Sequence, residues 1–388
     1  MAAMAGSRHD ARALSALTGS WALAWRNLLQ DRIRFAMSVL GIALAVMLIL
    51  FLFGLNAGIY RGVAAYLNNA PGSVIVMPQG VKSSFAGSGQ LLPPETAGTV
   101  TGKLGDRAGV TPVLTLNAVP ELHGRKENIR LVGYDPALGG GPWKLSDGRE
   151  PAADNEIVLD RVLADRHNFK VGDSLDVQGL QLIVVGLSME TSSFTGSIAF
   201  ARKALVESLV LAPGGASFLL ITPGPGSNAG DIINELRTVP GTNVLLKQEV
   251  ISNDKKTLAR SINQVIYLMV TAAFIVGALV VGMVIYTATI ERRSEYGVIK
   301  AIGARSGVLY RVVAAQALVA AGLGVLVGVG LAFLMGQVVA TLRPQFLVDI
   351  ERSAIAYTVA AGFIMALLGG LAPARALAGL APADVFRR

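Results

Sequence analysis

Four stretches of the chain are apolar and contain no Asp, Glu, Lys or Arg over a length that can cross a bilayer. They cover residues 35–60, 261–290, 312–342 and 353–374, and roughly 20 helical residues are enough to cross about 30 Å of hydrocarbon. Within hydrocarbon, only helices and closed barrels satisfy every backbone group, and these stretches have the length of helices. The sequence therefore predicts an integral membrane α-helical protein with four transmembrane helices. Its low content of charged residues, 15%, agrees with this class.

The positive charge of the chain lies on one side of these spans. Four crossings place residues 1–34, 291–311 and 375–388 together, and these segments hold 13 basic and 5 acidic residues. The long segment 61–260 holds 19 of each, and the short loop 343–352 holds two of each. By the positive-inside rule the basic side is cytoplasmic, so we expect both termini in the cytoplasm and residues 61–260 outside it. Topology and contact with membrane lipids thus account for the net charge of +8, and no nucleic-acid partner is expected.

The cytoplasmic segment 1–34 ends in an amphipathic pattern. At 100° per residue, Trp21 and Trp25 share a face with Leu28 and Leu29, while Arg, Asn, Gln and Asp side chains fall on the opposite face. Tryptophan is enriched where a membrane meets water. We predict an interfacial helix anchored by these two indoles. The alternative is that this segment merely extends the first span.

Residues 61–260, between the first and second spans, are expected to form a large α+β domain. Short β-branched and aliphatic runs bounded by turn residues predict strands, and longer periodic runs predict helices. The predicted strands are residues 73–77, 128–133, 155–159, 174–178 and 179–186, and the predicted helices are 162–167, 202–211 and 228–239.

No arrangement of side chains in this domain predicts catalysis. The chain has no cysteine, which excludes disulfides and thiol chemistry, and His123 and His167 are too far apart in sequence to predict a metal pair. No G-x-x-x-x-G-K-[ST] motif occurs, so this chain is not expected to bind ATP. We therefore expect no enzyme activity, metal or cofactor. The local acidic residues are interpreted as a solvated face, and they are Asp147, Glu150, Asp154 and Glu156.

The loop between the second and third spans carries the most specific local pattern, Glu291-Arg-Arg-Ser-Glu-Tyr-Gly-Val-Ile-Lys-Ala-Ile-Gly-Ala304. As a helix it places Glu291 and Glu295 on one face and Tyr296 and Lys300 on the other, and Gly303 suits the helix C-terminus. Such a helix can dock into a groove on a soluble partner. Composition alone leaves open a second interpretation, a loop whose arginines only determine topology.

This loop resembles the corresponding loop of ABC permeases of the MacB/FtsX type. The residues that match that motif are Glu291, Arg292, Arg293, Glu295, Gly297, Lys300 and Gly303. The resemblance extends along the chain, with overall proportions similar to DevC-like glycolipid-export permeases, although no single residue assigns that subgroup. The other matching segments are Trp25–Leu28, Arg32–Gly41, Asn155–Gly186, Pro373–Arg375 and Pro382–Arg387.

The resemblance implies a mechanism and a set of partners. Two permease copies, here expected to be a homodimer, would bind a dimer of separate ATP-binding subunits that hold ATP and Mg. Residues 291–303, Tyr296 included, would be the coupling helix seated in the ATPase. Closure of the ATPase would move the extracytoplasmic domain without a conventional channel. The resemblance also implies a bacterial inner membrane location and an extracytoplasmic adaptor or hydrolase as a further possible partner.

Three functions remain open at this point. The first, favoured by the size of the extracytoplasmic domain, is export of a lipid or hydrophobic compound by mechanotransmission. The second is an FtsX-like transmitter that activates an extracytoplasmic cell-wall hydrolase or adaptor. The third is a receptor or structural membrane protein unrelated to ABC systems.

Small residues within the spans predict close helix packing. Gly54 and Gly58 are four residues apart in the first span, and Gly324 and Gly328 have the same spacing in the third. This spacing places both glycines of a pair on one helix face, where neighbouring backbones can approach. No charged side chain interrupts a span, so no ion path through the bilayer is expected.

Overall fold

The computed structural model describes residues 32–84, 89–193, 196–291, 306–343 and 345–378. It divides into two compact units. We call the first, Met1–Leu55 with Gln264–Val338 and Val348–Arg388, the helical unit, and the second, Asn56–Asn263 with Val339–Leu347, the α/β unit.

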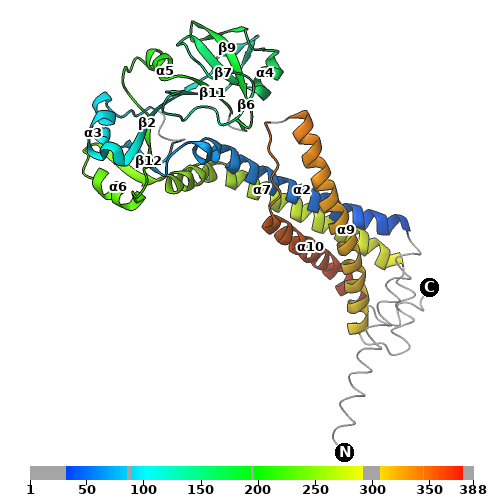
Figure 1. Cartoon of the computed structure of the whole chain (residues 1–388). Helices are drawn as coiled ribbons and strands as arrows, with labels where there is room; N and C mark the ends of the chain where they lie inside the picture. The colour runs from blue at the N-terminus through cyan, green and yellow to red at the C-terminus, as the bar shows by residue number, and fades with distance from the viewer. Residues whose placement is uncertain (1–31, 85–88, 194–195, 292–305, 344, 379–388) are drawn as a thin grey trace, which may run out of the picture. The chain divides into compact units, whose positions relative to one another are not determined.

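Four long helices make up the described part of the helical unit, and three of them extend into the α/β unit (Figure 1). Each is long and apolar enough to cross a membrane, so the predicted fold class is confirmed. The helices also run beyond the predicted spans. Their bounds are α2 (Arg32–Asn69), α7 (Lys247–Glu291), α9 (Ser306–Leu342) and α10 (Arg352–Ala378).

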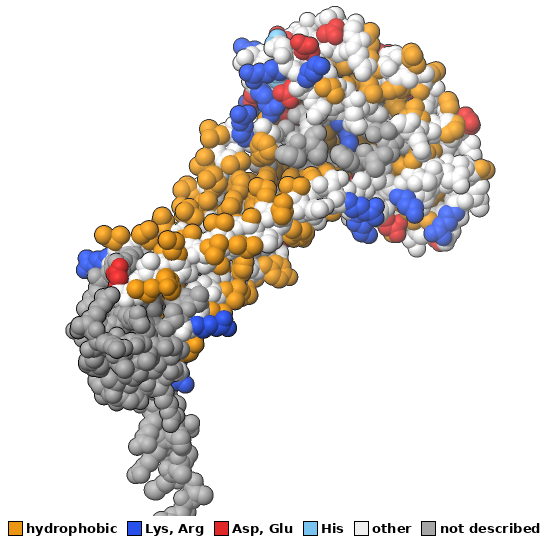
Figure 2. Space-filling model, turned by 180° about the vertical axis from the view of Figure 1, so that it is seen from behind, with side chains coloured by type: hydrophobic (Ala, Val, Ile, Leu, Met, Phe, Trp, Pro, Cys, Tyr) orange, Lys and Arg blue, Asp and Glu red, His pale blue; other side chains and the backbone are white. Residues whose placement is uncertain are grey.

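The helical unit has an apolar interior and an apolar surface. Ile42 and Val46 of α2 are fully buried, together with Val281 of α7 and Met365 of α10. Long aliphatic side chains on the outside remain exposed, such as Leu326, whose exposed fraction is 71%. Figure 2 shows these hydrophobic side chains gathered over the helical unit, whereas the Lys, Arg, Asp and Glu side chains lie mostly on the α/β unit. A surface of this kind suits contact with hydrocarbon.

One sheet forms the centre of the α/β unit, with the strand order β13-β1-β12-β2-β5-β11-β7-β9-β6. Strand β2 joins the two halves of the sheet, because its first residues pair with β12 and its last residues pair with β5. Strand β10 pairs with β11 and β8 with β9, while β3 and β4 form a separate hairpin. The bounds are β1 (Val74–Pro78), β2 (Ala108–Ala118), β3 (Glu121–Leu122), β4 (Arg125–Lys126), β5 (Ile129–Tyr134), β6 (Leu145–Gly148), β7 (Glu156–Asp160), β8 (Ser174–Val177), β9 (Leu180–Ser188), β10 (Ser192–Ser193), β11 (Gly196–Arg202), β12 (Phe218–Pro223) and β13 (Thr242–Leu246).

Short helices and the ends of two long helices cover this sheet. One face packs against α4 and α5 at one half and against α3 and α6 at the other. Against the other face pack Tyr66 and Leu67 from the end of α2 and Val250 and Ile251 from the start of α7. The bounds are α3 (Pro94–Leu104), η1 (Gly105–Arg107), α4 (Arg161–His167), α5 (Lys203–Val210) and α6 (Ala229–Leu236).

The strands that sequence patterns predict correspond to β1, β5, β7, β8 and β9, and the predicted helices correspond to α4, α5 and α6. Four long strands, β2, β11, β12 and β13, were not predicted. Strand β2 contains Pro112 and Asn117, two residue types that strands usually avoid. Pairing with β12 and β5 on either side overrides this local preference.

Candidate functional site

Most of the predicted coupling helix lies outside the described residues. Glu291 is the last residue of α7 and is exposed. Residues 292–305, which include Arg292, Arg293, Glu295, Tyr296, Gly297, Lys300 and Gly303, are not described, and neither are Trp21 and Trp25. Both the coupling helix and the interfacial anchor therefore stay predictions.

Gly324 and Gly328 of α9 lie against α2 inside the helical unit. Both are buried, and a Cβ added to Gly324 would lie 2.7 Å from Cβ of Ile42. A Cβ added to Gly328 would lie 2.6 Å from the carbonyl oxygen of Ala43. Carbon atoms in ordinary contact are about 3.5–4.0 Å apart, so no larger side chain fits without moving the helices. The two glycines let the backbones of α9 and α2 approach closely.

Gly54 and Gly58 of α2 lie against the connection between α9 and α10. A Cβ on Gly54 would lie 2.9 Å from Cγ1 of Val348, and one on Gly58 would overlap the carbonyl group of Leu347. At these positions α2 contacts the connection between α9 and α10 in place of another helix. The backbone N–H of Asp349 donates to the carbonyl oxygen of Gly54 at 2.9 Å, which ties this connection to α2.

A second glycine contact, not predicted, joins α7 to α10. A Cβ on Gly369 would lie 2.8 Å from the carbonyl oxygen of Ala278, and one on Gly282 would lie 3.1 Å from the carbonyl oxygen of Gly369. The presence of Gly282 and Gly369 within two predicted spans is the sequence signal that indicates close helix packing. Their partner could not be read from sequence because these residues are far apart along the chain.

Polar side chains join α2 to α7 near the ends of the predicted spans. The Oδ1 atom of Asn263 accepts hydrogen bonds from the hydroxyl of Tyr60 and from Nδ2 of Asn56, the latter at 3.4 Å. Hydrogen bonds between two apolar helices hold the helices together, because each polar group would otherwise lie in hydrocarbon without a hydrogen-bond partner. The sequence signal that could have revealed this contact is an Asn within each of two apolar stretches.

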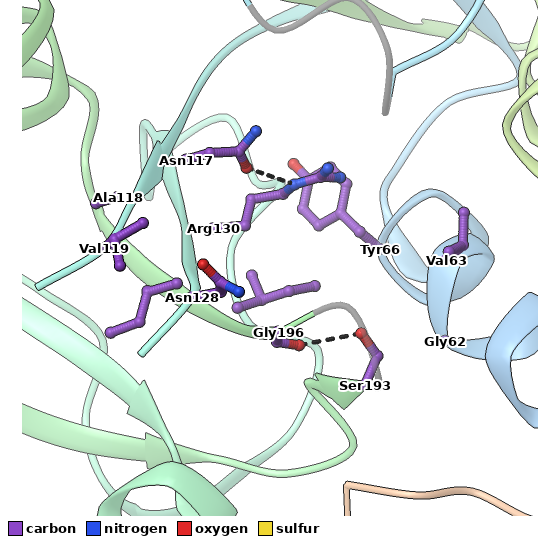
Figure 3. Close-up of a pocket in the computed structure, with 12 residues that line it drawn as sticks. Gly62, Val63, Tyr66, Asn117, Ala118, Val119, Asn128, Arg130, Ser193 and Gly196 are labelled. Atoms are coloured by element: carbon purple, nitrogen blue, oxygen red, sulfur yellow. Dashed lines mark hydrogen bonds between the residues drawn. The ribbon is translucent and has the colours of Figure 1, made fainter. Parts of the chain in front are cut away.

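A pocket of about 260 Å³ lies where the end of α2 meets the sheet (Figure 3). One wall comes from Gly62, Val63 and Tyr66 of α2. The opposite wall comes from the ends of β2 and β5 and from β11. Its polar lining residues are Asn117, Asn128, Arg130 and Ser193.

Arg130 of β5 is the charged group of this pocket and is half-buried. Its Nε donates to Oδ1 of Asn117 at 3.3 Å. Burial lowers the pKa of Arg130, and the carboxylate of Asp254 opposes that effect. Asp254 is fully buried on α7 and accepts a hydrogen bond of 2.6 Å from the hydroxyl of Ser84. Such a pocket can bind a small polar or anionic group, because guanidinium groups favour carboxylates and phosphates.

Asp160 is a buried acid that sequence reasoning did not single out. It ends β7 and caps α4, accepting a hydrogen bond of 3.0 Å from the backbone N–H of Leu163. The hydroxyl of Thr191 donates to its other oxygen at 2.7 Å, and Thr191 is also bonded to Ser188. Burial raises the pKa of Asp160, and these hydrogen bonds act in the opposite direction. The network joins β7, β9 and α4, which is a structural role.

Three of the four local acidic residues, Glu150, Asp154 and Glu156, are paired with neighbouring side chains. Arg149 makes two hydrogen bonds with Glu156, at 2.6 and 2.7 Å. The guanidinium of Arg149 lowers the pKa of Glu156 to about 2. Tyr134 donates to Glu150 at 2.7 Å, and burial first and then Glu150 raise the pKa of this tyrosine. The four acids thus do not converge as a catalytic pair would.

The two histidines lie closer together than their sequence separation suggests, without forming a metal site. Nδ1 of His123 lies 2.8 Å from the carbonyl oxygen of His167, and Nε2 of His167 lies 2.9 Å from Oε1 of Glu127. A ring of Phe169 stacks on His123 at 4.9 Å. Among the described residues, no three His, Cys, Asp or Glu side chains are grouped to hold a metal ion.

Comparison with known protein families finds two matches. The MacB-like periplasmic core domain matches residues 35–239, which is more than half of the chain. The FtsX-like permease C-terminal domain matches residues 267–382. Together they cover most of the chain, with residues 240–266 lying between the two matches.

Two relatives illustrate the sequence similarity. An uncharacterized ABC transporter permease of Mycobacterium tuberculosis is 27% identical over 365 residues, which cover 94% of this chain and 98% of the relative. A Staphylococcus haemolyticus protein named as a hemin transport system permease, HrtB, is 23% identical and covers 90% of this chain and 94% of its own length.

Among solved structures, the periplasmic region of MacB from Actinobacillus actinomycetemcomitans aligns with 49% of this chain and 96% of its own. Its TM-score is 0.37 and its sequence identity is 10%. The extracellular domain of the ABC-type transporter YknZ from Gram-positive bacteria aligns with 45% of this chain at a TM-score of 0.32 and 14% identity.

Proposed function

The chain belongs to the MacB/FtsX type of ABC transporter permeases, and on this premise we propose that it exports a lipid or another hydrophobic compound by mechanotransmission. A separate ATP-binding subunit, which ABC permeases require, supplies the energy. The α/β unit faces the outside of the cell and moves in response to ATP hydrolysis. Both termini are cytoplasmic, and two copies of the chain work together.

The apolar interior of the helical unit carries this proposal. Its described core consists of aliphatic and small residues, among them Ile42, Val281 and Met365, with glycines that bring helix backbones together. A permease that moves polar substrates through the bilayer needs polar or ionisable groups along their path. No Asp, Glu, Lys or Arg lies within the four predicted spans. A single copy therefore suits the transmission of movement better than passage of a polar solute.

The continuity of two helices supports the same mechanism. Helices α2 and α7 each contribute residues to both units without a break. Asn56, Tyr60 and Asn263 bond these two helices to each other close to the ends of the predicted spans. Displacement of the cytoplasmic ends can reach the α/β unit along them. Hemin, which gives the staphylococcal relatives their name, belongs to the proposed class of hydrophobic cargo.

The ATP-binding partner is tested by purification from the native membrane in a gentle detergent, followed by mass spectrometry. We expect a soluble ATP-binding subunit to accompany the wild-type chain. A variant with Glu291→Ala, Glu295→Ala and Lys300→Ala is expected to lose it, because these charges would seat the coupling helix. Wild-type protein that repeatedly arrives without such a subunit would contradict the proposal.

A matched control changes three charges far from the coupling loop in sequence. Glu121, Arg125 and Lys126 are exposed on the β3–β4 hairpin, so their replacement by alanine alters surface charge without removing a buried contact. This control is expected to keep the partner. If both triple variants lose it, general instability explains the loss, and the coupling helix is not supported.

Export is separated from signalling by reconstituting the complete complex in vesicles with ATP. Export predicts ATP-dependent transfer of a labelled lipid or hydrophobic compound from the bilayer to an acceptor protein outside. The FtsX-like alternative predicts no transfer, with ATP-dependent activation of a cell-wall hydrolase in its place. The hydrolase result would overturn export while leaving the family assignment intact.

A further inference from the structure

A second cavity of the α/β unit, about 410 Å³ in volume, shares the lining residue Gly62 with the Arg130 pocket. One wall is a stripe of α2 that follows helical spacing, formed by Arg61, Gly62, Ala65 and Asn69. The other walls come from the sheet, from α4 and from the connection after α9. They are formed by Trp143, Val162, Glu190, Ser192 and Leu347.

The α2 wall leaves room because its central residues are small. Gly62 and Ala65 lie one turn apart on the same face, and neither projects a side chain longer than a methyl group. The floor is apolar, with Trp143 and Val162 lining it, and Leu347 adds an apolar side chain at the exposed edge. Ligand cavities in proteins are commonly about 300–1,000 Å³ and are lined mostly by apolar side chains with a few polar groups. This cavity has both properties.

The cavity lies at the depth where the chain leaves the predicted spans. Along α2, Ala65 is about 7.5 Å beyond residue 60, the last residue of the first predicted span. Leu347 lies in the short connection between the third and fourth predicted spans and is 41% exposed. Both walls therefore belong near the membrane surface, within reach of lipids in the adjacent leaflet.

The chemistry of the rim differs from that of the floor. Arg61, Asn69 and Glu190 are exposed polar residues, and Glu190 accepts a hydrogen bond of 2.7 Å from Nζ of Lys144. On the floor, the indole of Trp143 packs edge-on against Phe200 at 6.1 Å. The buried Nε1 atom of Trp143 finds no hydrogen-bond acceptor among the described residues. A polar rim over an apolar floor fits an amphiphile.

We propose that this cavity binds an acyl chain of a membrane phospholipid, with the lipid headgroup at the rim around Arg61. The membrane depth of the α2 and Leu347 walls, the apolar floor and the charged rim all favour this occupant. The inference rests on the proposed function for the identity of the leaflet and for the transport step. Lipid binding itself does not depend on either.

The test uses Trp143 as its own probe, because only two other tryptophans, Trp21 and Trp25, occur in the chain. Replacing both by Phe leaves Trp143 as the sole indole in the full-length protein, which is placed in nanodiscs. The phospholipids carry bromine in the middle of their acyl chains, and bromine quenches indole fluorescence on contact. We expect Trp143 emission to fall progressively as the brominated fraction rises.

Variants in the same background show where quenching occurs. Ala65→Leu should fill the cavity and abolish the quenching, and Val162→Phe should do so from the opposite wall. Val63→Leu changes the neighbouring face of α2, which lines the Arg130 pocket, and should leave quenching unchanged. An unaltered Trp143 emission maximum in unbrominated lipid establishes that each variant is folded.

A positive control places an indole on the membrane-facing surface. Tyr267→Trp, in a variant without the three natural tryptophans, lies on α7 at a position that is 54% exposed. It should be quenched in every brominated nanodisc. If this indole is quenched and Trp143 is not, the acyl-chain proposal is overturned.

Two further measurements identify the ligand and distinguish failure of this inference from failure of the proposed function. Quenching by a brominated fatty acid in unbrominated nanodiscs, without quenching by brominated phospholipid, would overturn the phospholipid assignment. ATP-dependent export from a complex whose Trp143 is never quenched would leave the proposed function standing and remove this site. Quenching that is lost in Ala65→Leu, in a complex that exports nothing, would support the site and contradict export.

Discussion

Two glycines of α9 provide a sharp test of how the membrane helices pack. Gly328 is buried against α2, where an added Cβ would lie 2.6 Å from the carbonyl oxygen of Ala43 and 2.8 Å from Cβ of Val46. Gly330, two residues further along, is exposed, and an added Cβ would meet no other atom within 4 Å. The chain thus offers a matched pair, Gly328→Ala and Gly330→Ala, in the same helix.

The free energies of unfolding of these two variants are expected to differ by about 1–3 kcal/mol. Inserting a methyl group into a packed contact costs about 1–3 kcal/mol, because α9 and α2 must separate by close to 1 Å. Both substitutions also gain up to about 1 kcal/mol from the better helix propensity of alanine. Since that gain is common to both, the difference between the variants isolates the packing at Gly328.

The measurement is thermal unfolding of the full-length chain in detergent, followed by the loss of its monodisperse peak in size-exclusion chromatography. A change of 1 kcal/mol moves the midpoint by about 2–4 °C for a cooperative unit of 150–250 residues, a range that includes the helical unit. Gly328→Ala should therefore melt about 2–12 °C below Gly330→Ala. Equal midpoints, or a lower midpoint for Gly330→Ala, would refute the close contact of α9 with α2.

Two further predictions concern acids of the α/β unit. Asp160→Ala should lower the free energy of unfolding by about 2–4 kcal/mol in thermal melts, because α4 loses its cap and the hydroxyl of Thr191 loses its acceptor. Asp160→Asn, which keeps an acceptor oxygen, should lower it clearly less, and equal losses for the two variants would contradict the hydrogen-bond explanation. Because Arg149 lowers the pKa of Glu156 to about 2 from an ordinary value of 4.5, the stability that Glu156 contributes is present above pH 4.5 and lost as the pH falls towards 2. In acid titrations followed by tryptophan fluorescence, Arg149→Ala should move part of the unfolding to higher pH, and an unchanged acid midpoint would show that the ion pair does not contribute.

The apolar stretches were enough to predict the four helices, and the strand-like and helical runs within residues 61–260 predicted the α+β class of the domain between the first and second. These properties are local, since a bilayer selects uninterrupted apolar runs wherever they occur. The motif from Glu291 to Gly303, together with the number of spans and the large domain after the first span, led to the family assignment, which two family matches confirm. The coupling role of its residues stays a prediction, because residues 292–305 are not described.

Partners across the chain could not be predicted from the same patterns. The spacing of Gly54 and Gly58 is indistinguishable from that of Gly324 and Gly328, yet the first pair contacts a loop segment and the second contacts a helix. Strand β2 carries weak local signals and exists because β12 and β5 pair with its two halves.

The cavity beside Trp143 depends on tertiary structure most of all. It is assembled from α2, the sheet, α4 and the connection after α9, which are widely separated in sequence. Sequence by itself determined which segments enter the membrane, because hydropathy is a property of each segment alone. Only the tertiary structure decided which faces meet and where a cavity remains, because close packing depends on the shapes of residues that are distant along the chain.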